Sequence, residues 1–204
     1  MFQRRGSNRE DLIKNRDRAG AHPVKLYLIR HGRASAGFAE AQDPGLDEVG
    51  RAQAQAIAQE LRLLGPLPLV TSPLKRARET AAPFATLWGL PARIEPDVGE
   101  IPSPVADLQV RAAWLRQALQ GRWSDLPPAY QEWRDRVVAC LQALKTTTVV
   151  ITHFVAINAV VGLATGDDRM VCFAPDHCSC TVLELIDGTL RVVKLGHQRA
   201  TQVL

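Results

Sequence analysis

The chain has 204 residues, 46% of them hydrophobic and 23% charged, which is enough for one domain with a buried core and too short for two full domains. Its 25 Lys and Arg outweigh its 21 Asp and Glu, so the net charge is +4, but residues 1–22 alone carry +3 of that charge. The rest of the chain is nearly neutral, which argues against nucleic acid or a membrane as a partner. We expect a basic, poorly ordered extension at 1–22 and one domain at 23–204.

The first part of the domain alternates between apolar runs with strand composition and longer stretches with helical spacing. One helical face carries five apolar side chains: Leu46, Val49, Ile57, Leu61 and Leu64. Ser72 and Pro73 supply an N-cap and a first-turn proline for a second helix, since the hydroxyl can accept from a free amide and Pro has no N–H to lose. These patterns predict strands at 24–30, 67–71 and 91–95 and helices at 46–64 and 72–88.

The pattern changes at about residue 102. Prolines there bracket two helical stretches, 106–119 and 129–144, which predict a helical insert at about 102–145 over the sheet. The last part of the chain predicts strands at 146–152, 178–186 and 190–195 and a helix at 154–163. The whole order indicates an α/β fold, a three-layer α/β/α sandwich in which a mainly parallel sheet has helices on both faces.

Polar side chains follow several of the predicted strands directly. Arg30, His31 and Gly32 come after the first strand, Arg76 lies in the first turn of the helix after the second, and His153 follows the strand at 146–152. Ligands of open α/β sheets bind beyond the carboxyl ends of the strands, so these side chains are expected at one rim. The planar guanidinium groups of arginines and the free amides at helix N-termini bind phosphoryl groups, so this rim suggests a site that binds a phosphoryl group.

The nucleophile candidate at this rim is a histidine. The sequence has no Walker loop and no Gly-x-Ser-x-Gly elbow, and its cysteines lie outside the predicted rim. Imidazole can attack phosphorus without a metal if nearby cations keep the ring neutral and disperse the charge on the equatorial oxygens. A protonated carboxyl group must then serve the leaving alcohol.

Four segments resemble a known family in order and spacing. They are LIRHGRAS at 28–35, DPGLDEVGRAQA at 43–54, TSPLKRARETA at 71–81 and VVITHFVAIN at 149–158. Together they resemble branch 1 of the histidine phosphatase superfamily, with the phosphoglycerate mutase-like fold, over essentially 24–195. The resemblance implies that His31 becomes phosphohistidine and that the phosphate pocket is formed by Arg30, His31, Gly32, Arg76, His153 and Phe154.

The family's proton donor is usually a Glu just past the third strand, and Glu100 stands at that place in DVGEIPSP. Glu95, Asp97 and Glu79 are the other carboxyl groups near the motifs, so the proton donor is the least specific of the residues carried over. Arg76 rather than Arg78 matches the family's second arginine.

Some residues depart from the family pattern. After Arg-His-Gly, many members have Glu, then Ser or Thr, and then Asn three positions on. This chain has Arg33, Ala34 and Gly37 at those positions, and Phe154 replaces the Gly that commonly follows the second His. Ile101 follows Glu100, without the Arg-His-Tyr of the mutases. We therefore expect a metal-independent phosphatase that hydrolyses phosphorylated small molecules through phosphohistidine and needs no cofactor. The alternatives are a phosphohistidine or phosphoprotein phosphatase, a mutase-type phosphotransferase, and a catalytically weak module that binds phospho-ligands.

Two further groups of residues have more than one interpretation. Arg33 is either a solvated loop residue or a second cation near the phosphate. An aromatic and basic set in the insert could line a lid over the substrate, although such sets are more often core plus solvated face: Trp114, Arg111, Arg116, Arg122 and Trp123.

The four cysteines, at 140, 172, 178 and 180, do not have the spacing of a disulfide framework. A reducing, cytoplasmic location is the expectation, and residues 1–22 lack the apolar run of a secretory signal. Cys172, His177, Cys178 and Cys180 could be imagined as a zinc cluster. The alternating run CSCTVLELI favours Cys178 and Cys180 as small buried side chains of a strand instead.

Overall fold

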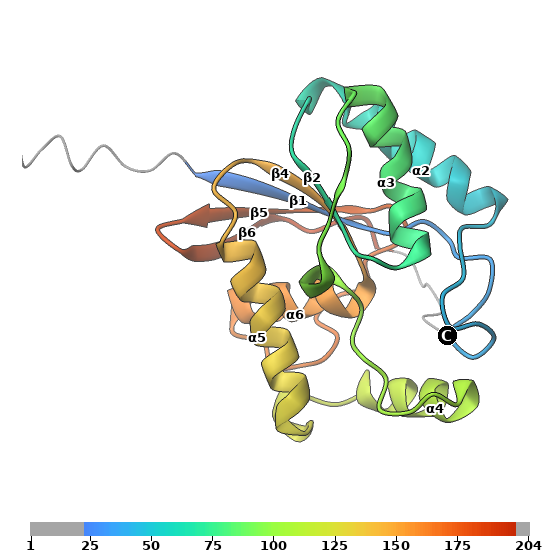
Figure 1. Ribbon diagram of the computed structural model, residues 1–204. Coiled ribbons are helices and arrows are strands. Elements are labelled where there is room, and N and C mark those ends of the chain that lie inside the picture. The colour runs from blue at the N-terminus through green and yellow to red at the C-terminus, as the bar shows by residue number, and fades with distance from the viewer. Residues whose placement is uncertain (1–22, 199–204) are drawn as a thin grey trace, which may run out of the picture.

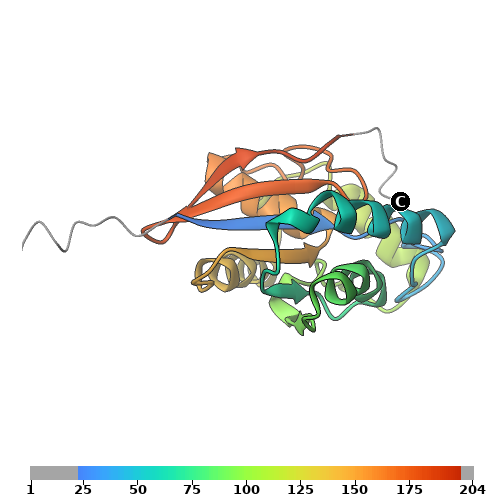
Figure 2. The same ribbon diagram turned by 90° about the horizontal axis from the view of Figure 1, so that it is seen from above.

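The computed structural model describes residues 23–198, so the expected extension at 1–22 lies outside the described residues. Six strands form one sheet in the order β3-β2-β4-β1-β5-β6. The first four strands in that order are parallel to one another. β5 pairs antiparallel with β1, and β6 pairs antiparallel with β5, so these two strands extend the sheet beyond β1 (Figure 2). The strands are β1 (Val24–Arg30), β2 (Leu69–Thr71), β3 (Arg93–Ile94), β4 (Thr148–Thr152), β5 (Cys180–Ile186) and β6 (Thr189–Lys194).

Helices cover both faces of this sheet, which confirms the predicted α/β sandwich. Figure 1 shows α2 (Glu48–Glu60) and α3 (Lys75–Trp88) on one side, and α5 (Pro128–Gln142) and α6 (Phe154–Thr165) on the other. The insert also contains α4 (Leu108–Ala118), which lies apart from the sheet below the ends of the parallel strands. Each face has its own apolar core, and a fully buried aliphatic side chain contributes roughly 1.5–3 kcal/mol to it.

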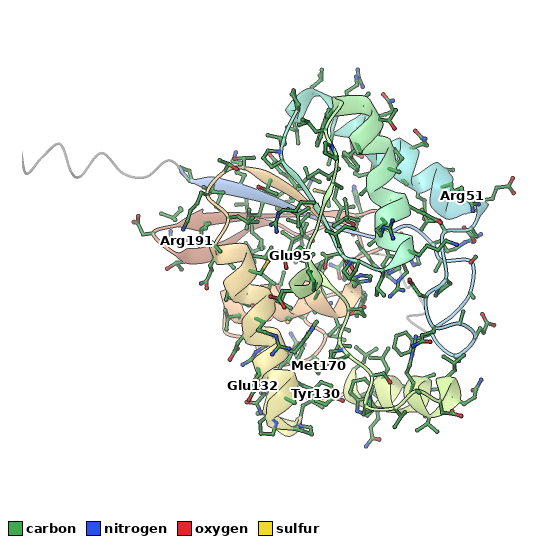
Figure 3. The ribbon with its side chains drawn as sticks, viewed as in Figure 1. Arg51, Glu95, Tyr130, Glu132, Met170 and Arg191 are labelled. Atoms are coloured by element: carbon green, nitrogen blue, oxygen red, sulfur yellow. The ribbon has the colours of Figure 1, made fainter. Side chains whose placement is uncertain are left out.

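The described side chains follow this layering. Arg51 on α2 extends into solvent, whereas Tyr130 and Met170 are buried in the core on the side of α5 and α6 (Figure 3). β4 is buried along its whole length, as expected for a parallel strand covered on both faces. No helix among residues 23–198 has the length and apolar character needed to cross a bilayer.

The register between β1 and β4 positions the polar residues that follow them. Arg30 lies opposite Thr152, so His31 and His153 leave the sheet at the same level. The amide of His31 then donates to the carbonyl of Thr152 at 2.9 Å. The end of the sheet thus brings together two residues that are 122 positions apart in the sequence.

The first predicted helix is shorter than 46–64. Asp47 is its N-cap and accepts from the amide of Gly50 at 2.7 Å, which sets the start of α2. A separate 3-10 turn, Arg62–Leu64, follows α2. The prediction of one buried face was wrong for Val49 and Leu64, which are 44% and 41% exposed. Val49 precedes buried Gly50 by about 100° around the helix, and the tighter turn rotates Leu64 off the buried stripe.

The N-cap predicted at Ser72 was also wrong. Helix α3 begins at Lys75, whose amide donates to the carboxylate of Asp43 at 2.9 Å. The cap therefore comes from the loop that precedes α2, a contact that local sequence rules do not reveal. The Oγ of Ser72 accepts from the amide of Leu74 at 3.2 Å, before the helix begins, and lies 2.7 Å from Nε2 of His153.

Close backbone packing joins the loop after β1 to the start of α2. A Cβ on Gly32 would lie 2.6 Å from the carbonyl oxygen of Gly50, and a Cβ on Gly50 would overlap the carbonyl of Arg33. The structure thus gives Gly32 a packing reason to be glycine, because the backbone of Gly50 occupies the space of a Cβ. Neither position has room for a methyl group without a backbone shift.

We expect Gly50→Ala to destabilise the fold by about 1–3 kcal/mol, because overpacking against the Arg33 carbonyl outweighs the better helix propensity of Ala. Thermal unfolding measures this difference. Gly121→Ala is the matched control, since the nearest atom to its added Cβ would be 3.5 Å away. An unchanged melting temperature for Gly50→Ala would show that the loop after β1 is not held in this way.

Candidate active site

Two buried histidines lie side by side at the carboxyl end of the sheet. His31 follows β1, His153 follows β4, and their ring centroids are 5.1 Å apart. His153 is fully buried and His31 is 7% exposed. The prediction that the strand ends bring both rings to one rim is therefore confirmed in its geometry.

Hydrogen-bond partners define the tautomer of His31. Its Nδ1 lies 2.8 Å from the carbonyl oxygen of Gly32, which can only accept, so Nδ1 carries the proton. Its Nε2 accepts from Nε of Arg76 at 3.1 Å, so Nε2 holds a lone pair. Burial, together with the charge of Arg76, places the pKa of His31 well below its usual range. The ring is therefore neutral, and the lone pair of Nε2 accepts from a cation.

Two buried arginines flank this ring. Arg30 ends β1, donates from Nη1 to the carbonyl of Pro175 at 2.8 Å, and lies over the ring of Phe154 with its Cζ 5.1 Å from the centroid. Arg76 comes from the first turn of α3, with Nη1 3.8 Å from a carboxylate oxygen of Asp43. Burial lowers the pKa of Arg30 to about 10, which still leaves it charged at neutral pH. Arg30 bonds to a carbonyl, and the carboxylate nearest to Arg76 is 3.8 Å away, so most of their positive charge beside His31 is left to attract an anion.

His153 has one bonded and one free ring nitrogen. Nε2 is 2.7 Å from Oγ of Ser72, whereas buried Nδ1 has no hydrogen-bond partner in the described part of the chain. Burial, followed by the charges of Arg76 and Arg30, places the pKa of His153 well below its usual range. Because Ser72 Oγ accepts from the amide of Leu74, its O–H can donate to Nε2, and Nδ1 then carries the proton and can donate to a bound anion.

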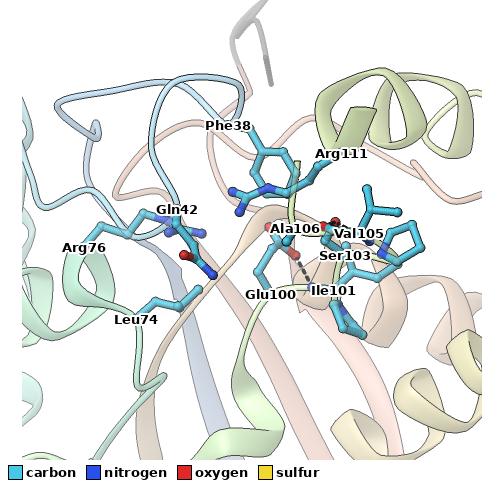
Figure 4. Close-up of a pocket in the computed structure, with 12 residues that line it drawn as sticks. Phe38, Gln42, Leu74, Arg76, Glu100, Ile101, Ser103, Val105, Ala106 and Arg111 are labelled. Atoms are coloured by element: carbon cyan, nitrogen blue, oxygen red, sulfur yellow. Dashed lines mark hydrogen bonds between the residues drawn. The ribbon is translucent and has the colours of Figure 1, made fainter. Parts of the chain in front are cut away.

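Glu100 points into the cavity beside these residues (Figure 4). Its Oε1 accepts from the amide of Ile101 at 3.0 Å, and burial raises the pKa of the carboxyl group. The competing carboxylates are engaged elsewhere: Glu79 accepts from the amide of Leu46 at 2.6 Å, and Glu95 pairs with Arg93 at 2.6 Å. Of these carboxyl groups, Glu100 is the one that lines the cleft together with His31.

The cleft over these residues has a volume of about 610 Å³. Its floor holds both arginines together with His31, Glu100 and Phe154, and its walls come from the loop at 33–44 and from α4. A neighbouring compartment of about 470 Å³ shares Phe38, Arg76, Glu100 and Arg111 with it (Figure 4). Clefts of 300–1,000 Å³ are typical of small-molecule sites.

The sequence reasoning missed His177 as a residue of this cleft. Its ring centroid is 5.9 Å from that of His31, and burial lowers its pKa to about 4. It precedes β5, and because β5 runs antiparallel, the start of β5 lies at the same rim as the ends of the parallel strands. Recognising 180–186 as an antiparallel neighbour of β1 was the signal that could have located it.

The structure also places Arg33 and the aromatic and basic residues of the insert, which had more than one interpretation. Arg33 pairs with Asp47 at 2.5 Å, at an exposed position on the cleft wall. Of the aromatic and basic set in the insert, Arg111 lines the cleft. Trp123 is buried against Trp133, and Trp114 packs on Tyr130. The lid interpretation is therefore not supported for the tryptophans, which belong to the core of the insert.

The cysteine-rich segment also differs from expectation. Cys178 was predicted to open the strand at 178–186, but it lies before β5 with φ of 54°, and its amide donates to the carbonyl of Arg30 at 3.0 Å. Cys180 does open the strand. Among residues 23–198, no three His, Cys, Asp or Glu side chains are placed to share a metal ion.

Known proteins resemble this chain at several levels. It is 39% identical over 84 residues to a PE-PGRS family protein of Mycobacterium tuberculosis, covering 38% of this chain and 14% of that protein. It is 24% identical over 162 residues to a probable phosphoglycerate mutase of Photorhabdus laumondii, covering 70% of this chain and 75% of that protein. The chain spans only a small part of the first relative, so the role of that protein is not assigned to this chain.

Solved structures give the same fold. A mycobacterial glucosyl-3-phosphoglycerate phosphatase in complex with VO3 superposes with a TM-score of 0.67 at 22% identity, over 86% of this chain and 100% of that one. The family model of the histidine phosphatase superfamily, branch 1, matches residues 26–198. With the Arg-His-Gly loop, the second arginine and the second histidine gathered at one rim, the chain belongs to branch 1 of the histidine phosphatase superfamily.

Proposed function

We propose that this protein is a phosphatase that hydrolyses phosphomonoesters through a phosphohistidine on His31. The observation that carries the proposal is the neutral His31 ring, whose unprotonated Nε2 lies 3.1 Å from Nε of buried Arg76. A nucleophile must keep its lone pair, and the tautomer of His31 leaves Nε2 unprotonated. The phosphoryl group must also be attracted to that atom, and the buried arginines supply the positive charge that attracts it.

In the first step, the N–H of Arg76 shifts from Nε2 of His31 to a phosphoryl oxygen, and the released lone pair of Nε2 attacks phosphorus in line with the leaving oxygen. The new P–N bond forms as the P–O bond breaks, and the electron pair of that bond goes to the leaving oxygen, which takes a proton from Glu100. Arg30, Arg76 and His153 disperse the charge of the equatorial oxygens. The modified ring becomes cationic, and the bond from Nδ1–H to the Gly32 carbonyl stabilises it.

In the second step, water attacks phosphorus and Glu100, now a carboxylate, takes its proton. The P–N bond breaks, its electron pair returns to Nε2, and inorganic phosphate leaves. The raised pKa of Glu100 suits this double role, because the group can be held protonated for the first step and ionised for the second. The protein groups named here complete both steps without a cofactor.

A small phosphorylated molecule is the proposed substrate. The cleft volume of about 610 Å³ favours a small molecule over a phosphoprotein. The names of similar proteins include both a phosphatase and a probable phosphoglycerate mutase. Hydrolysis is proposed over transfer because apolar Ile101 and Pro102 follow Glu100 and line the substrate compartment, where the mutases of the family have polar residues.

We expect vanadate to inhibit turnover of p-nitrophenyl phosphate at micromolar concentration, because its five-coordinate oxyanion resembles the phosphoryl transition state. EDTA should leave the rate unchanged. A panel of sugar phosphates, nucleotides and phosphopeptides, assayed by phosphate release, is expected to show small molecules as the better substrates. Loss of activity in EDTA with recovery on adding a divalent metal would overturn the proposed mechanism, and brisk turnover of phosphopeptides alone would overturn the substrate class.

A further inference from the structure

Arg111 is a buried cation that the proposed phosphatase chemistry does not use. It lies in the first turn of α4, is 7% exposed, and lines both compartments of the cleft. Its Nη2 reaches the carbonyl of Ala41 at a long 3.5 Å, and its buried Nε has no hydrogen-bond partner among the described residues. A buried guanidinium with so few partners is costly for the folded protein unless a ligand pairs with it.

The orientation of Arg111 is fixed by Phe38. The Cζ atom lies 3.7 Å from the centroid of the Phe38 ring, so one face of the guanidinium is covered by the aromatic ring (Figure 4). The N–H groups point outward from the edges of that plane, and apart from the long bond from Nη2 to Ala41 no described residue accepts from them. A planar fork held in this way suits a carboxylate or phosphate that accepts two parallel bonds.

The other arginines of the cleft already have partners or a role. Arg33 is paired with Asp47 at 2.5 Å and Arg76 has Asp43 at 3.8 Å. Arg30 lies beside the histidines, where the phosphoryl group is proposed to bind. No carboxylate among residues 23–198 lies within 4.0 Å of the Arg111 guanidinium. The charge of Arg111 is therefore left for a ligand.

We propose that Arg111 binds a second anionic group of the substrate, a carboxylate or a second phosphate, and so selects phosphomonoesters that carry two anions. This rests on the proposed phosphatase function. The walls of the compartment beside Arg111 are formed by Ile101, Pro102, Pro104 and Val105, which would pack against a short carbon skeleton between the anions. The phosphoryl group would bind at the histidines and the second anion at α4.

A pair of matched substrates tests this inference. Carboxyphenyl phosphate and carbamoylphenyl phosphate, each as the 3- and 4-isomer, have nearly the same shape and differ in the charge of the distal group. We expect kcat/KM to favour the carboxylate in at least one isomer, and Arg111→Met to reduce that preference on the order of ten- to hundredfold. Arg116→Met is the matched control, since Arg116 is an exposed residue of the same helix, and it should leave the preference unchanged.

Equal losses on both substrates in Arg111→Met, or no preference in the wild-type protein for either isomer, would overturn the inference. Thermal unfolding checks that the variants fold. Arg111→Lys is a second variant that keeps the charge and loses the fork, and it should retain an intermediate preference. If Arg111→Met does not fold, a full wild-type preference in Arg111→Lys would contradict the role of the planar fork.

A binding experiment separates this inference from the phosphatase proposal. Calorimetry with phosphonocarboxylates of two to five carbons, their carboxamides and the matching bisphosphonates needs no turnover. We expect at least one dianionic ligand to bind about tenfold or more tighter than its carboxamide, with the difference lost in Arg111→Met. The bisphosphonates distinguish phosphate from carboxylate as the preferred second anion. Absence of turnover with intact Arg111-dependent binding would refute the phosphatase, whereas turnover without Arg111-dependent binding would refute the second-anion site.

Discussion

Replacing His31 with Ala is expected to lower kcat on every phosphomonoester by on the order of 10³-fold or more. The substitution removes Nε2, the one atom that takes the phosphoryl group in the proposed reaction, together with the ring that Gly32 and Arg76 hold in position. Steady-state kinetics with p-nitrophenyl phosphate measure the loss, and the activated leaving group keeps residual rates detectable.

His177→Asn is the control for this prediction. His177 lies in the same cleft, with its ring 5.9 Å from that of His31, but it makes no hydrogen bond to either buried arginine in the described part of the chain. We expect this variant to retain activity within about tenfold of the wild type, as for a residue that borders a site without forming bonds in the reaction. A His31→Ala protein with near-normal activity, or a larger loss in His177→Asn, would assign the nucleophile elsewhere.

Glu100→Gln is expected to slow hydrolysis of alkyl phosphates by about 10²–10⁴-fold, the range of general acid catalysis. An alkoxide needs a proton as it leaves, whereas nitrophenolate is stable without one. The loss on p-nitrophenyl phosphate should therefore be much smaller. Measuring kcat/KM for both kinds of substrate in wild type and variant gives the leaving-group dependence, and equal losses on both would move the proton donor to another carboxyl group.

The pH profile gives a second test of Glu100. Burial raises its pKa, so the protonated form needed for the first step persists above the usual range of a carboxyl group and is lost as pH rises through the raised value. Neutral His31 is present at all pH values above its lowered pKa, which puts the acidic limb below the usual histidine range. The ratio of wild-type to Glu100→Gln kcat/KM on an alkyl phosphate should fall with rising pH, and a flat ratio would contradict the acid role.

Much of the site was predictable because it depends on strand ends. Arg30, His31 and His153 follow apolar runs that are recognisable in the sequence, and parallel pairing of those runs brings the residues to one rim. Arg76 was located by its place in the first turn of the next helix. The sandwich with its two helical layers was predictable for a similar reason, because the spacing of apolar residues within each segment indicates whether that segment is a helix or a strand.

Contacts between distant segments were not predictable in this way. Asp43 accepts from the first amide of α3 although it lies 32 residues earlier in the sequence, whereas the expected cap, Ser72, accepts from Leu74 before the helix begins. Arg111 enters the cleft because Phe38 and Ala41 of the loop after β1 receive its guanidinium. Such pairings depend on how loops pack in space, and neither helical spacing nor residue type encodes them.

Direct detection of phosphohistidine tests the central proposal most closely. The protein is mixed with a ³²P-labelled phosphomonoester, quenched in alkali within milliseconds to seconds, and the label is mapped by peptide mass spectrometry. We expect an acid-labile, alkali-stable phosphoryl group on the peptide that contains His31, and no label in His31→Ala. Turnover of the same substrate with no label on His31, or with the label on His153 or His177, would contradict the proposed mechanism.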